Sequence, residues 1–333
     1  MSDFPAEPHA NPGVSAVLTV IVNFNSGDLL LKSVKSLKCQ TFTDYRLIVV
    51  DNASKDDSID LLLAHYPDVE VLHAEENLGF AAANNLAARV HPNTPWIVLL
   101  NPDAFPEPDW LQRLVEAAEG HPECAAFASC TLIASEPSIM DGAGDAYHVS
   151  GRYWRRENLC PRPKQRMRNE EIFSACAAAA LYARDAWDEV GGLDEDFFCY
   201  GEDVDLGFRL QLAGHKCLYV PEAIVYHEGS AVTGRRSDFS TYYSQRNLVW
   251  VYVKNMPSLL FWALLPYHML LNIAAMFACL LRGQAIVVWK AKRDAIRWMP
   301  RVWRKRSLIQ RMRRATARQV WKILERGWPG PRC

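Results

Sequence analysis

Hydrophobic and polar positions along the first 120 residues alternate between the pattern of buried strands and the pattern of amphipathic helices. Continuous apolar runs predict strands at residues 14–23, 45–51, 69–73 and 96–101. Apolar residues at helical spacing predict a helix that begins at Asp28 and further helices at residues 56–65, 79–90 and 109–120. Strands and helices in this order form a mostly parallel sheet with helices on both faces, so we expect an α/β protein of Rossmann-like type.

The pattern changes after this first unit. Residues 134–168 are rich in Pro, Gly and Arg, and we expect them to form a mobile insertion over the functional site. A strand is predicted at residues 173–182 and a helix at residues 240–255. Residues 1–13 have neither the basic nor the apolar segment of a signal peptide, and we expect a short disordered tail there.

Polar residues follow three of the predicted strands at the point where each strand ends. They are Asn23, Asn25, Asp51, Asn52, Asn101 and Asp103. The carboxyl ends of parallel strands meet at one edge of a sheet, where such proteins bind their ligands. An acid after the second strand can accept hydrogen bonds from a nucleotide base or a ribose. Taken alone, capping of the following helix is the better explanation of Asp51.

Two further features fit a bound nucleotide. Asn77 and Gly79 precede a helix rich in small residues, which lets a ligand approach closely, and a helix start can bind phosphate. Tight packing of the helix on the sheet explains the same residues equally well. Asp103 could hold a divalent cation, and a distant His227 could be its second ligand, a pair that suits Mn²⁺ somewhat better than Mg²⁺. The alternatives are a turn at Asn101-Pro102 and a structural histidine.

The segment from Phe197 to His227 is the most informative one. An aromatic turn closed by Gly201 leads to the adjacent acids Glu202 and Asp203 and then to a helical run of apolar residues. Acids at a helix start are favoured by the helix dipole, so capping alone could account for them. Two adjacent acids, with a histidine about two dozen residues further on, also fit a general base and a metal ligand.

Five stretches of the chain resemble family 2 glycosyltransferases with a GT-A fold, nearest to the bacterial rhamnosyltransferase-like branch. They read VLTVIVNFNS, LIVVDNASKDDS, ENLGFAAANN, WIVLLNPDA and VGGLDEDFFCYGEDVDLGFRLQLAGHKCLYVPEAIVYHEGSA. The resemblance covers residues 14 to about 255 in the family's order. One position departs from it, because the family's Asp-x-Asp metal motif begins here with Asn101, which leaves Asp103 as its only carboxylate.

The resemblance implies inverting transfer of a sugar from a nucleotide diphosphate to an acceptor hydroxyl. By position, Asp51 would hold the nucleotide base, and Asn77 and Asn84 would lie near the donor. Asp103 and His227 would hold Mn²⁺ or Mg²⁺ on the diphosphate. Asp203 would be the general base, while Glu202 would bind the acceptor or raise the pKa of its neighbour by like-charge repulsion. An exchange of roles within this acid pair is the main alternative.

Composition adds a division between the two ends of the chain. The net charge is −1, yet residues 282–333 hold 16 Lys and Arg against the two acids Asp294 and Glu325. An acidic body with a basic end needs an anionic partner surface. The nine cysteines form neither a C-x-x-C pair nor a zinc spacing, so we expect buried thiols in a reducing compartment.

Residues 258–281 form an uncharged run of 24 residues, long enough to span a bilayer. A single span would put the basic tail outside the cell, against the positive-inside rule, because nucleotide sugars and hence the catalytic body are cytosolic. We therefore expect an in-plane or re-entrant helix. Beyond it, Ile309, Met312, Thr316, Val320 and Ile323 share one helix face between basic residues, a pattern suited to anionic lipid.

These observations predict a disordered tail at residues 1–13, a GT-A domain at 14–255 and a membrane-associating helical extension at 256–333. The expected partners are a nucleotide-diphosphate sugar, a lipid-linked or glycan acceptor and the cytoplasmic face of the inner membrane, with peripheral or monotopic attachment and no nucleic acid. The leading donor is dTDP-L-rhamnose. The alternatives are a UDP-sugar donor (galactofuranose or glucose), a catalytically silent scaffold, and a homodimer that buries the apolar run.

Overall fold

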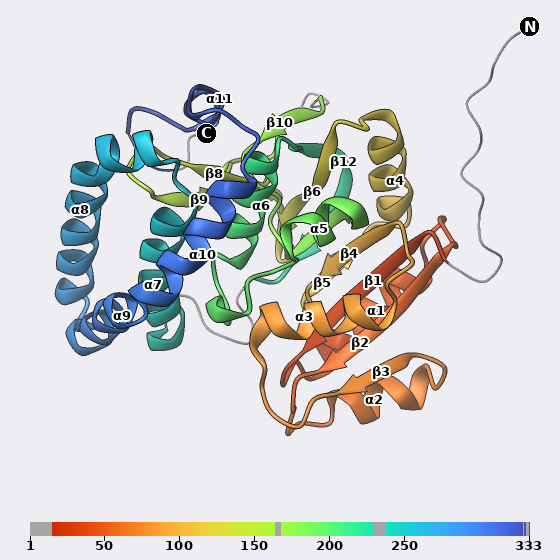
Figure 1. The fold of residues 1–333 in the computed structure, drawn as a ribbon. Coiled ribbons are helices and arrows are strands. Elements are labelled where there is room, and N and C mark those ends of the chain that lie inside the picture. The colour runs from red at the N-terminus through yellow and green to blue at the C-terminus, as the bar shows by residue number, and fades with distance from the viewer. Residues whose placement is uncertain (1–14, 164–167, 230–236, 329, 331–332) are drawn as a thin grey trace, which may run out of the picture.

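The computed structural model describes residues 15–163, 168–229, 237–328, 330 and 333, so the tail predicted at residues 1–13 lies outside the described residues. A ten-stranded mixed sheet crosses the molecule in the order β10-β12-β6-β11-β4-β1-β2-β3, with β5 paired to β12 and β7 paired to β6 (Figure 1). The strands are β1 (Val17–Asn23), β2 (Tyr45–Asp51), β3 (Glu70–His73), β4 (Trp96–Leu100), β5 (Ala104–Pro106), β6 (Cys124–Ile133), β7 (Glu136–Gly142), β10 (Glu170–Ile172), β11 (Ala179–Ala183) and β12 (Lys216–His227). A separate pair is formed by β8 (Asp145–Tyr147) and β9 (Tyr153–Arg155).

Helices cover this sheet and extend beyond it on one side. The helices are α1 (Asp28–Lys38), α2 (Ser58–His65), α3 (Gly79–Val90), α4 (Trp110–Gly120), α5 (Arg184–Val190), the 3₁₀ helix η1 (Glu195–Phe197), α6 (Glu202–Ala213), α7 (Asp238–Asn255), α8 (Ser258–Leu281), α9 (Ala285–Arg297), α10 (Met299–Met312) and α11 (Ala317–Ile323). The expected α/β architecture, with a C-terminal helical part, is confirmed.

The parallel part of the sheet follows the predicted pattern. Strand β1 lies between β2 and β4 and pairs with both in parallel, and β3 continues the sheet beyond β2. Alternate residues of β1 enter two different hydrophobic clusters, Leu18 and Val20 on one face and Val17 and Ile21 on the other. Both faces of the sheet are buried under helices, and this explains why the strands are continuous apolar runs in the sequence.

Antiparallel pairing completes the second half of the sheet and brings distant residues together. Strand β12 runs parallel to β6 and antiparallel to the short strand β5, in a register that pairs His227 with Ala104. The backbone N–H of Glu228 donates to the carbonyl of Asp103 at 3.0 Å. This pairing places the end of β12 beside the residues that follow β4. Asn101 and His227, which meet there, are 126 residues apart in the sequence.

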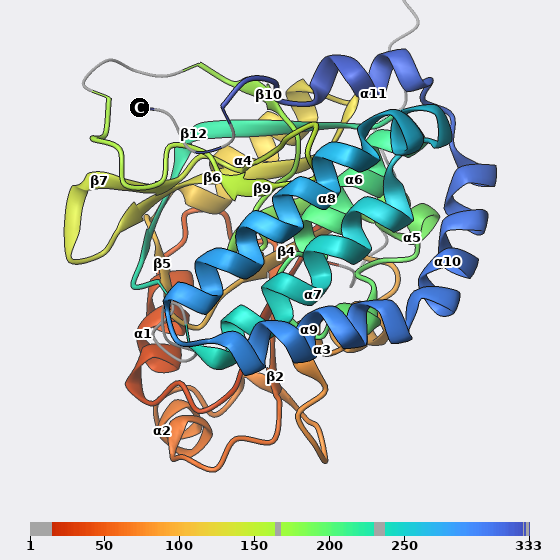
Figure 2. The same cartoon turned by 90° about the vertical axis from the view of Figure 1, so that its left-hand side faces the viewer.

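Helices α7 to α10 lie side by side against the body of the protein (Figure 2). A third hydrophobic cluster joins the body to these helices, because it includes Phe208 of α6 and Trp250 of α7 together with Phe261 of α8 and Val302 of α10. Lys254 strengthens this joint from α7, where its ammonium contacts Asp194 at 2.5 Å and Asp205 at 2.7 Å. The division of the chain at residue 255 stays a prediction.

Some sequence-based expectations were wrong in detail. The described part of the insertion contains secondary structure, because β7 pairs with β6, although with two register shifts, and β8 pairs with β9. The strand expected at residues 173–182 begins only at Ala179. The helix face expected from Ile309 to Ile323 is divided between α10 and α11. Finally, Cys160 and Cys333 form a disulfide, so the expectation that every cysteine is a buried thiol was wrong.

Candidate active site

A cavity of about 220 Å³ lies at the carboxyl ends of β1, β2 and β4. Its lining residues are Val22, Phe24, Asn52, Asn77, Gly79, Phe80, Asn101, Pro102, Asp103, Arg155, Phe198, Cys199, Tyr200, His227 and Phe239. A larger cavity of about 780 Å³, between the loop at residues 191–196 and α10, is lined by none of the residues predicted for the site. The smaller cavity is therefore the candidate active site, because it has the expected position in an α/β sheet.

One side of this cavity is formed by the start of α3. Asn52 donates from its side chain to the Asn77 side chain at 2.9 Å and accepts a hydrogen bond from the Leu78 N–H at 2.8 Å. Gly79 has a φ of 80°, and a Cβ atom at this position would overlap the Phe198 ring. The glycine is therefore needed both for its backbone conformation and for the close approach of the segment that carries Phe198.

Four other predicted donor residues do not line the cavity. Asn23 is fully buried and donates to Asp51 at 3.3 Å, while Asp51 also accepts a hydrogen bond from the Ser54 N–H at 3.3 Å. Asn25 is exposed and accepts a hydrogen bond from the Lys55 N–H at 2.7 Å. Asn84 is buried and donates to the Phe80 carbonyl within its own helix at 2.9 Å. Asn23 and Asp51 thus support the loop beside the cavity.

The opposite side of the cavity holds the predicted metal ligands. The Nε2 atom of His227 lies 3.2 Å from Asp103 Oδ1 and 3.5 Å from the Asn101 amide nitrogen. Its Nδ1 atom lies 2.8 Å from Asp141 Oδ2. Burial lowers the pKa of His227, but the carboxylates of Asp103 and Asp141 raise it to about 9. A histidine held through one ring nitrogen by a carboxylate, with the other nitrogen beside a second carboxylate, is the arrangement that metal-binding histidines adopt.

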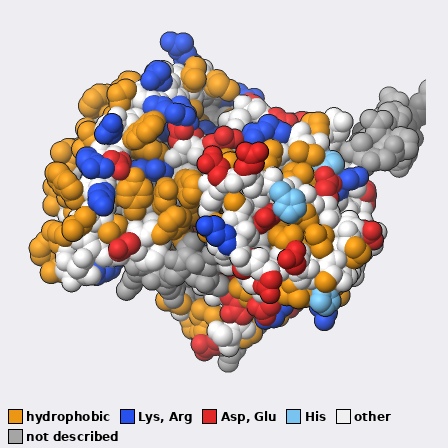
Figure 3. All heavy atoms as spheres, turned by 90° about the horizontal axis from the view of Figure 1, so that it is seen from below, with side chains coloured by type: hydrophobic (Ala, Val, Ile, Leu, Met, Phe, Trp, Pro, Cys, Tyr) orange, Lys and Arg blue, Asp and Glu red, His pale blue; other side chains and the backbone are white. Residues whose placement is uncertain are grey.

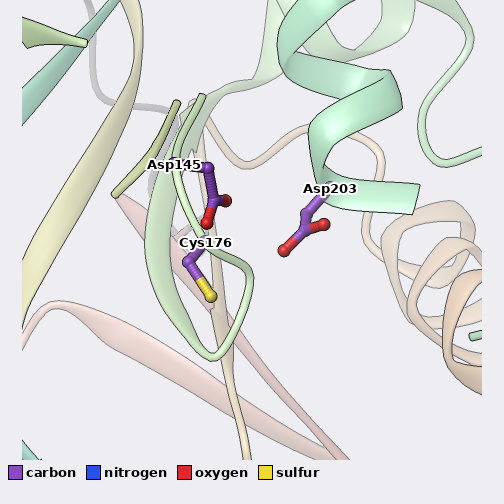
Figure 4. A group of neighbouring side chains, drawn as sticks. All are labelled: Asp145, Cys176 and Asp203. Carbon is purple, nitrogen blue, oxygen red and sulfur yellow. The ribbon is translucent and has the colours of Figure 1, made fainter. Parts of the chain in front are cut away.

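This donor set fits a divalent cation at Asp103 and His227. One carboxylate oxygen and one imidazole nitrogen are ligands that Mn²⁺ accepts, and the remaining positions would be left for phosphate oxygens and water. A second group of potential ligands, Asp145, Cys176 and Asp203, has atoms within 4.8 Å of one another (Figure 4). Arg155 already contacts this thiol at 3.1 Å, and its positive charge would oppose a cation there.

The two adjacent acids at the start of α6 have different surroundings. Glu202 is only 5% exposed, and its Oε2 atom has no hydrogen-bond partner among the residues that the structure describes. Burial, together with the nearby charge of Asp203, raises the pKa of Glu202 well above its ordinary value. Asp203 is less buried and accepts hydrogen bonds from the N–H groups of Val204 at 2.8 Å and Ala177 at 3.2 Å. Burial raises the pKa of Asp203, while these N–H groups favour its charged form.

Asp145 approaches the same carboxylate from β8. The Asp145, Cys176 and Asp203 side chains point toward one another (Figure 4). Asp145 is 6% exposed, and within the described part of the chain its Oδ2 atom has no hydrogen-bond partner. Burial raises the pKa of Asp145 well above its ordinary value, and the charge of Asp203 raises it further. Burial thus raises the pKa of all three carboxyl groups, Asp203 included, and two backbone N–H groups favour the charged form of Asp203.

Sequence reasoning missed the residues that the insertion contributes. Asp141, Asp145 and Arg155 all belong to the segment expected to be mobile, and all three lie in or beside the site. Arg155 connects its two halves, since one guanidinium nitrogen contacts Asp141 and the other lies 3.1 Å from Cys176. The alternation of Gly and Asp in the segment MDGAGDAY was the available signal, because tight backbone packing around acids is typical of a site.

Comparison with known proteins identifies the class. Residues 19–191 match the family described as glycosyl transferase family 2, which is more than half of the chain. An N-acetylglucosaminyl-diphospho-decaprenol L-rhamnosyltransferase of Mycobacterium tuberculosis is 30% identical over 238 residues, 65% of this chain and 77% of the relative. Rhamnosyltransferase WbbL of Escherichia coli (strain K12) is 27% identical over 225 residues, 63% of this chain and 83% of the relative.

The fold is shared with a solved glycosyltransferase structure. GalNAc-T7, crystallised with UDP, GalNAc and Mn²⁺, superimposes with a TM-score of 0.59 and 18% identity over 73% of this chain. The matched region is about half of that protein, 48% of its length. The protein described here therefore belongs to glycosyl transferase family 2 and has a GT-A-like fold. It is a glycosyltransferase of the bacterial rhamnosyltransferase-like branch.

Proposed function

We propose that this protein transfers L-rhamnose from dTDP-L-rhamnose to a hydroxyl group of a lipid-linked or polysaccharide acceptor during bacterial cell-surface glycan synthesis. The two rhamnosyltransferase relatives support the sugar, and the name of the mycobacterial relative supports a lipid-linked acceptor. The observation that carries the proposal is the pairing of two sites. Asp103 and His227, the proposed cation ligands, lie in the cavity, and Arg155 contacts both Asp141 beside His227 and Cys176, whose Sγ lies within 4.8 Å of the Asp203 carboxylate.

The chemistry requires a base on one side of the anomeric carbon and charge stabilisation on the other. The acceptor oxygen forms a bond to the anomeric carbon as the bond from that carbon to the diphosphate breaks, with its electron pair passing to the diphosphate oxygen. Asp203 takes the acceptor proton, which gives inversion at the anomeric carbon. A divalent cation at Asp103 and His227, once bound, neutralises the leaving diphosphate.

The acid pair assigns the base to Asp203. A base must be ionised and must be reachable by the acceptor, and Asp203 is the less buried member of the pair. Glu202 is buried, and burial together with the charge of Asp203 raises its pKa well above the ordinary value, which favours its protonated form. Glu202 therefore serves as a neutral neighbour that keeps the site free of a second negative charge.

The second part of the proposal is attachment to the cytoplasmic face of the inner membrane, as a peripheral or monotopic protein. Large apolar side chains of three neighbouring helices are exposed: Leu259, Trp262, Tyr267, Met269, Leu270, Ile273, Phe277, Leu281, Ile286, Trp289, Ile296 and Leu308. Figure 3 shows hydrophobic side chains gathered on the side of the molecule that these helices form, with Lys and Arg among them. Apolar and basic side chains in one surface suit the interface of an anionic membrane.

Helix α8 is long and apolar enough to cross a membrane by length and composition. Its other face argues for an in-plane position, because polar residues there bind the body of the protein. The Nδ1 atom of His268 lies 2.9 Å from the Ser150 carbonyl oxygen. Lys292 of α9, which is 8% exposed, donates to Asn272 of α8 at 2.6 Å. A helix held along the body in this way presents one side to lipid and keeps the basic tail on the cytoplasmic side.

Release of sugar from a panel of nucleotide sugars tests the proposed function. The full chain is incubated with dTDP-L-rhamnose, UDP-galactofuranose, UDP-glucose and UDP-galactose in the presence of Mn²⁺. We expect hydrolysis or transfer with dTDP-L-rhamnose above all others. A clear preference for a UDP-sugar would replace the donor, and no turnover of any donor would leave a nucleotide-sugar-binding scaffold.

A further inference from the structure

Arg155 stands out as a cation inside the active-site cavity that the sequence did not predict. It ends β9, and it lines the same cavity as Asp103 and His227. Its side chain is 27% exposed, so the guanidinium is neither a surface charge nor closed off from the cavity. Because guanidinium stays protonated at every pH at which proteins are stable, it places a fixed positive charge beside the proposed donor.

The surrounding backbone leaves room for this side chain. At Gly142, the last residue of β7, a Cβ atom would overlap the Cγ and Cδ atoms of Arg155. The stem of the arginine thus passes over a strand position that carries no side chain. One end of its guanidinium is fixed by Asp141, whose Oδ2 atom also contacts His227 Nδ1. The arginine is held from one side, in a fixed relation to the proposed cation site.

The other end of the guanidinium has a poor partner. Its Nη2 atom contacts Cys176 Sγ at 3.1 Å. Burial raises the pKa of the Cys176 thiol, which is therefore neutral, and a neutral sulfur is a weak hydrogen-bond acceptor. Phosphate oxygens accept from guanidinium far more strongly, and the planar fork matches phosphate geometry. A phosphate group in the cavity would thus replace a weak interaction by a strong one.

We propose that Arg155 binds the β-phosphate of the nucleotide-sugar donor, in addition to the proposed cation at Asp103 and His227, and stabilises the diphosphate as it leaves. The position of Arg155 singles out the β-phosphate, which is the group next to the transferred sugar. One end of the guanidinium contacts Asp141, which also contacts His227, and the other end contacts Cys176, whose Sγ lies within 4.8 Å of the carboxylate of the proposed base Asp203. As the bond from the anomeric carbon to the β-phosphate oxygen breaks, its electron pair stays on that oxygen, beside this positive charge. The proposal rests on the proposed function, since it needs a nucleotide diphosphate in this cavity.

Binding of nucleotides without any turnover tests this assignment. Dissociation constants for dTDP, dTMP, UDP and UMP are measured by titration calorimetry with the full chain and Mn²⁺, for the wild type, Arg155→Gln and Arg155→Lys. Arg156→Gln is the matched control, because Arg156 contacts Glu170 and does not line the cavity. Thermal unfolding of each variant is recorded beside the titration.

We expect Arg155→Gln to weaken binding of the preferred diphosphate by about tenfold or more, the size of a lost hydrogen bond to a charged group. Binding of the matching monophosphate should stay within about twofold, and Arg156→Gln should change neither. Arg155→Lys keeps the charge without the fork and should fall between, which provides the test if the Gln variant does not fold. Equal losses of affinity for the diphosphate and the monophosphate would overturn the assignment and make Arg155 a structural residue. Unchanged affinity for the diphosphate in Arg155→Gln would also overturn it. A wild type that binds no nucleotide would overturn the proposed function, and this assignment with it.

Discussion

Substitution of the two adjacent acids separates a general base from its neutral neighbour. Asp203→Asn keeps the shape of the side chain but removes its ability to take a proton. A positioned general base contributes about 10²–10⁴-fold to a rate, so kcat should fall by roughly that factor. Because Asp203 does not line the donor cavity, nucleotide diphosphate binding should stay within a few-fold of wild type.

The matched change at the neighbouring position should behave differently. Glu202 is 5% exposed and its raised pKa favours the protonated form, so Glu202→Gln replaces that form by a neutral group of the same shape. We expect it to keep most of the wild-type kcat. Steady-state transfer kinetics, with calorimetry of nucleotide diphosphate binding, distinguish the two variants. Substantial turnover in Asp203→Asn together with an inactive Glu202→Gln would refute this reasoning and exchange the two roles.

The pH dependence gives an independent check of the same pair. Burial raises the pKa of Asp203 above the ordinary value of 3.8. The base works only when ionised, so kcat/KM should fall as the pH drops through this raised pKa, at a higher pH than for an exposed aspartate. Because the pKa of Glu202 is raised well above its ordinary value, Glu202→Gln should shift the midpoint little. A midpoint that moves strongly in Glu202→Gln would show that the glutamate itself titrates there.

Three further predictions concern stability, the metal and the membrane. Lys254→Met should lower the free energy of unfolding by about 1.5–3 kcal/mol in urea titrations, since it removes one charged partner from the buried carboxylates of Asp194 and Asp205, which keep Lys305 and Arg209. Burial raises the pKa of Asp194, but Lys254 lowers it strongly. The stabilisation is therefore present near neutral pH and lost as the pH falls through the depressed pKa. If Lys254→Met unfolded in acid at the same pH as the wild type, this reasoning would be contradicted. Chelator should abolish transfer, Mn²⁺ or Mg²⁺ should restore it, and Asp103→Ala should weaken diphosphate binding as well; full activity in chelator would remove the metal from the account. Trp262→Ser and Trp289→Ser, at positions that are 65% and 64% exposed, should reduce sedimentation of the protein with anionic vesicles without loss of folding. High salt should release only part of the wild type from the vesicles. Unchanged sedimentation of the variants would place the membrane-binding surface elsewhere.

The elements that the sequence predicted best are those whose pattern is local. Strand β2 and helix α3 begin and end where predicted, because a continuous apolar run and a helical period are each complete within the element. The sequence also pointed to Asp103 and His227 as candidate cation ligands, because each stands in a recognisable motif, and their role stays a prediction. Their closeness came from the resemblance, because the pairing of β5 with β12 joins segments far apart in the chain.

The residues that the sequence did not reveal depend on long-range packing. Asp141, Asp145 and Arg155 lie on short strands without a clear period, and only the folded insertion brings them to α6 and β12. The break between α10 and α11 is marked in the sequence by a helix-capping motif. Thr316 and Gln319 form a capping box, which marks a helix start within the helix face that was read as continuous.

The stereochemistry of the transferred sugar tests the central claim most directly. The full chain is incubated with dTDP-L-rhamnose, Mn²⁺ and a prenol-linked N-acetylglucosaminyl diphosphate, and the anomeric configuration of the product is determined by NMR. A single displacement with Asp203 as base predicts a new glycosidic bond with the configuration opposite to that of the donor. A product that retains the configuration of the donor would contradict the account, because retention requires two displacements or a front-face reaction.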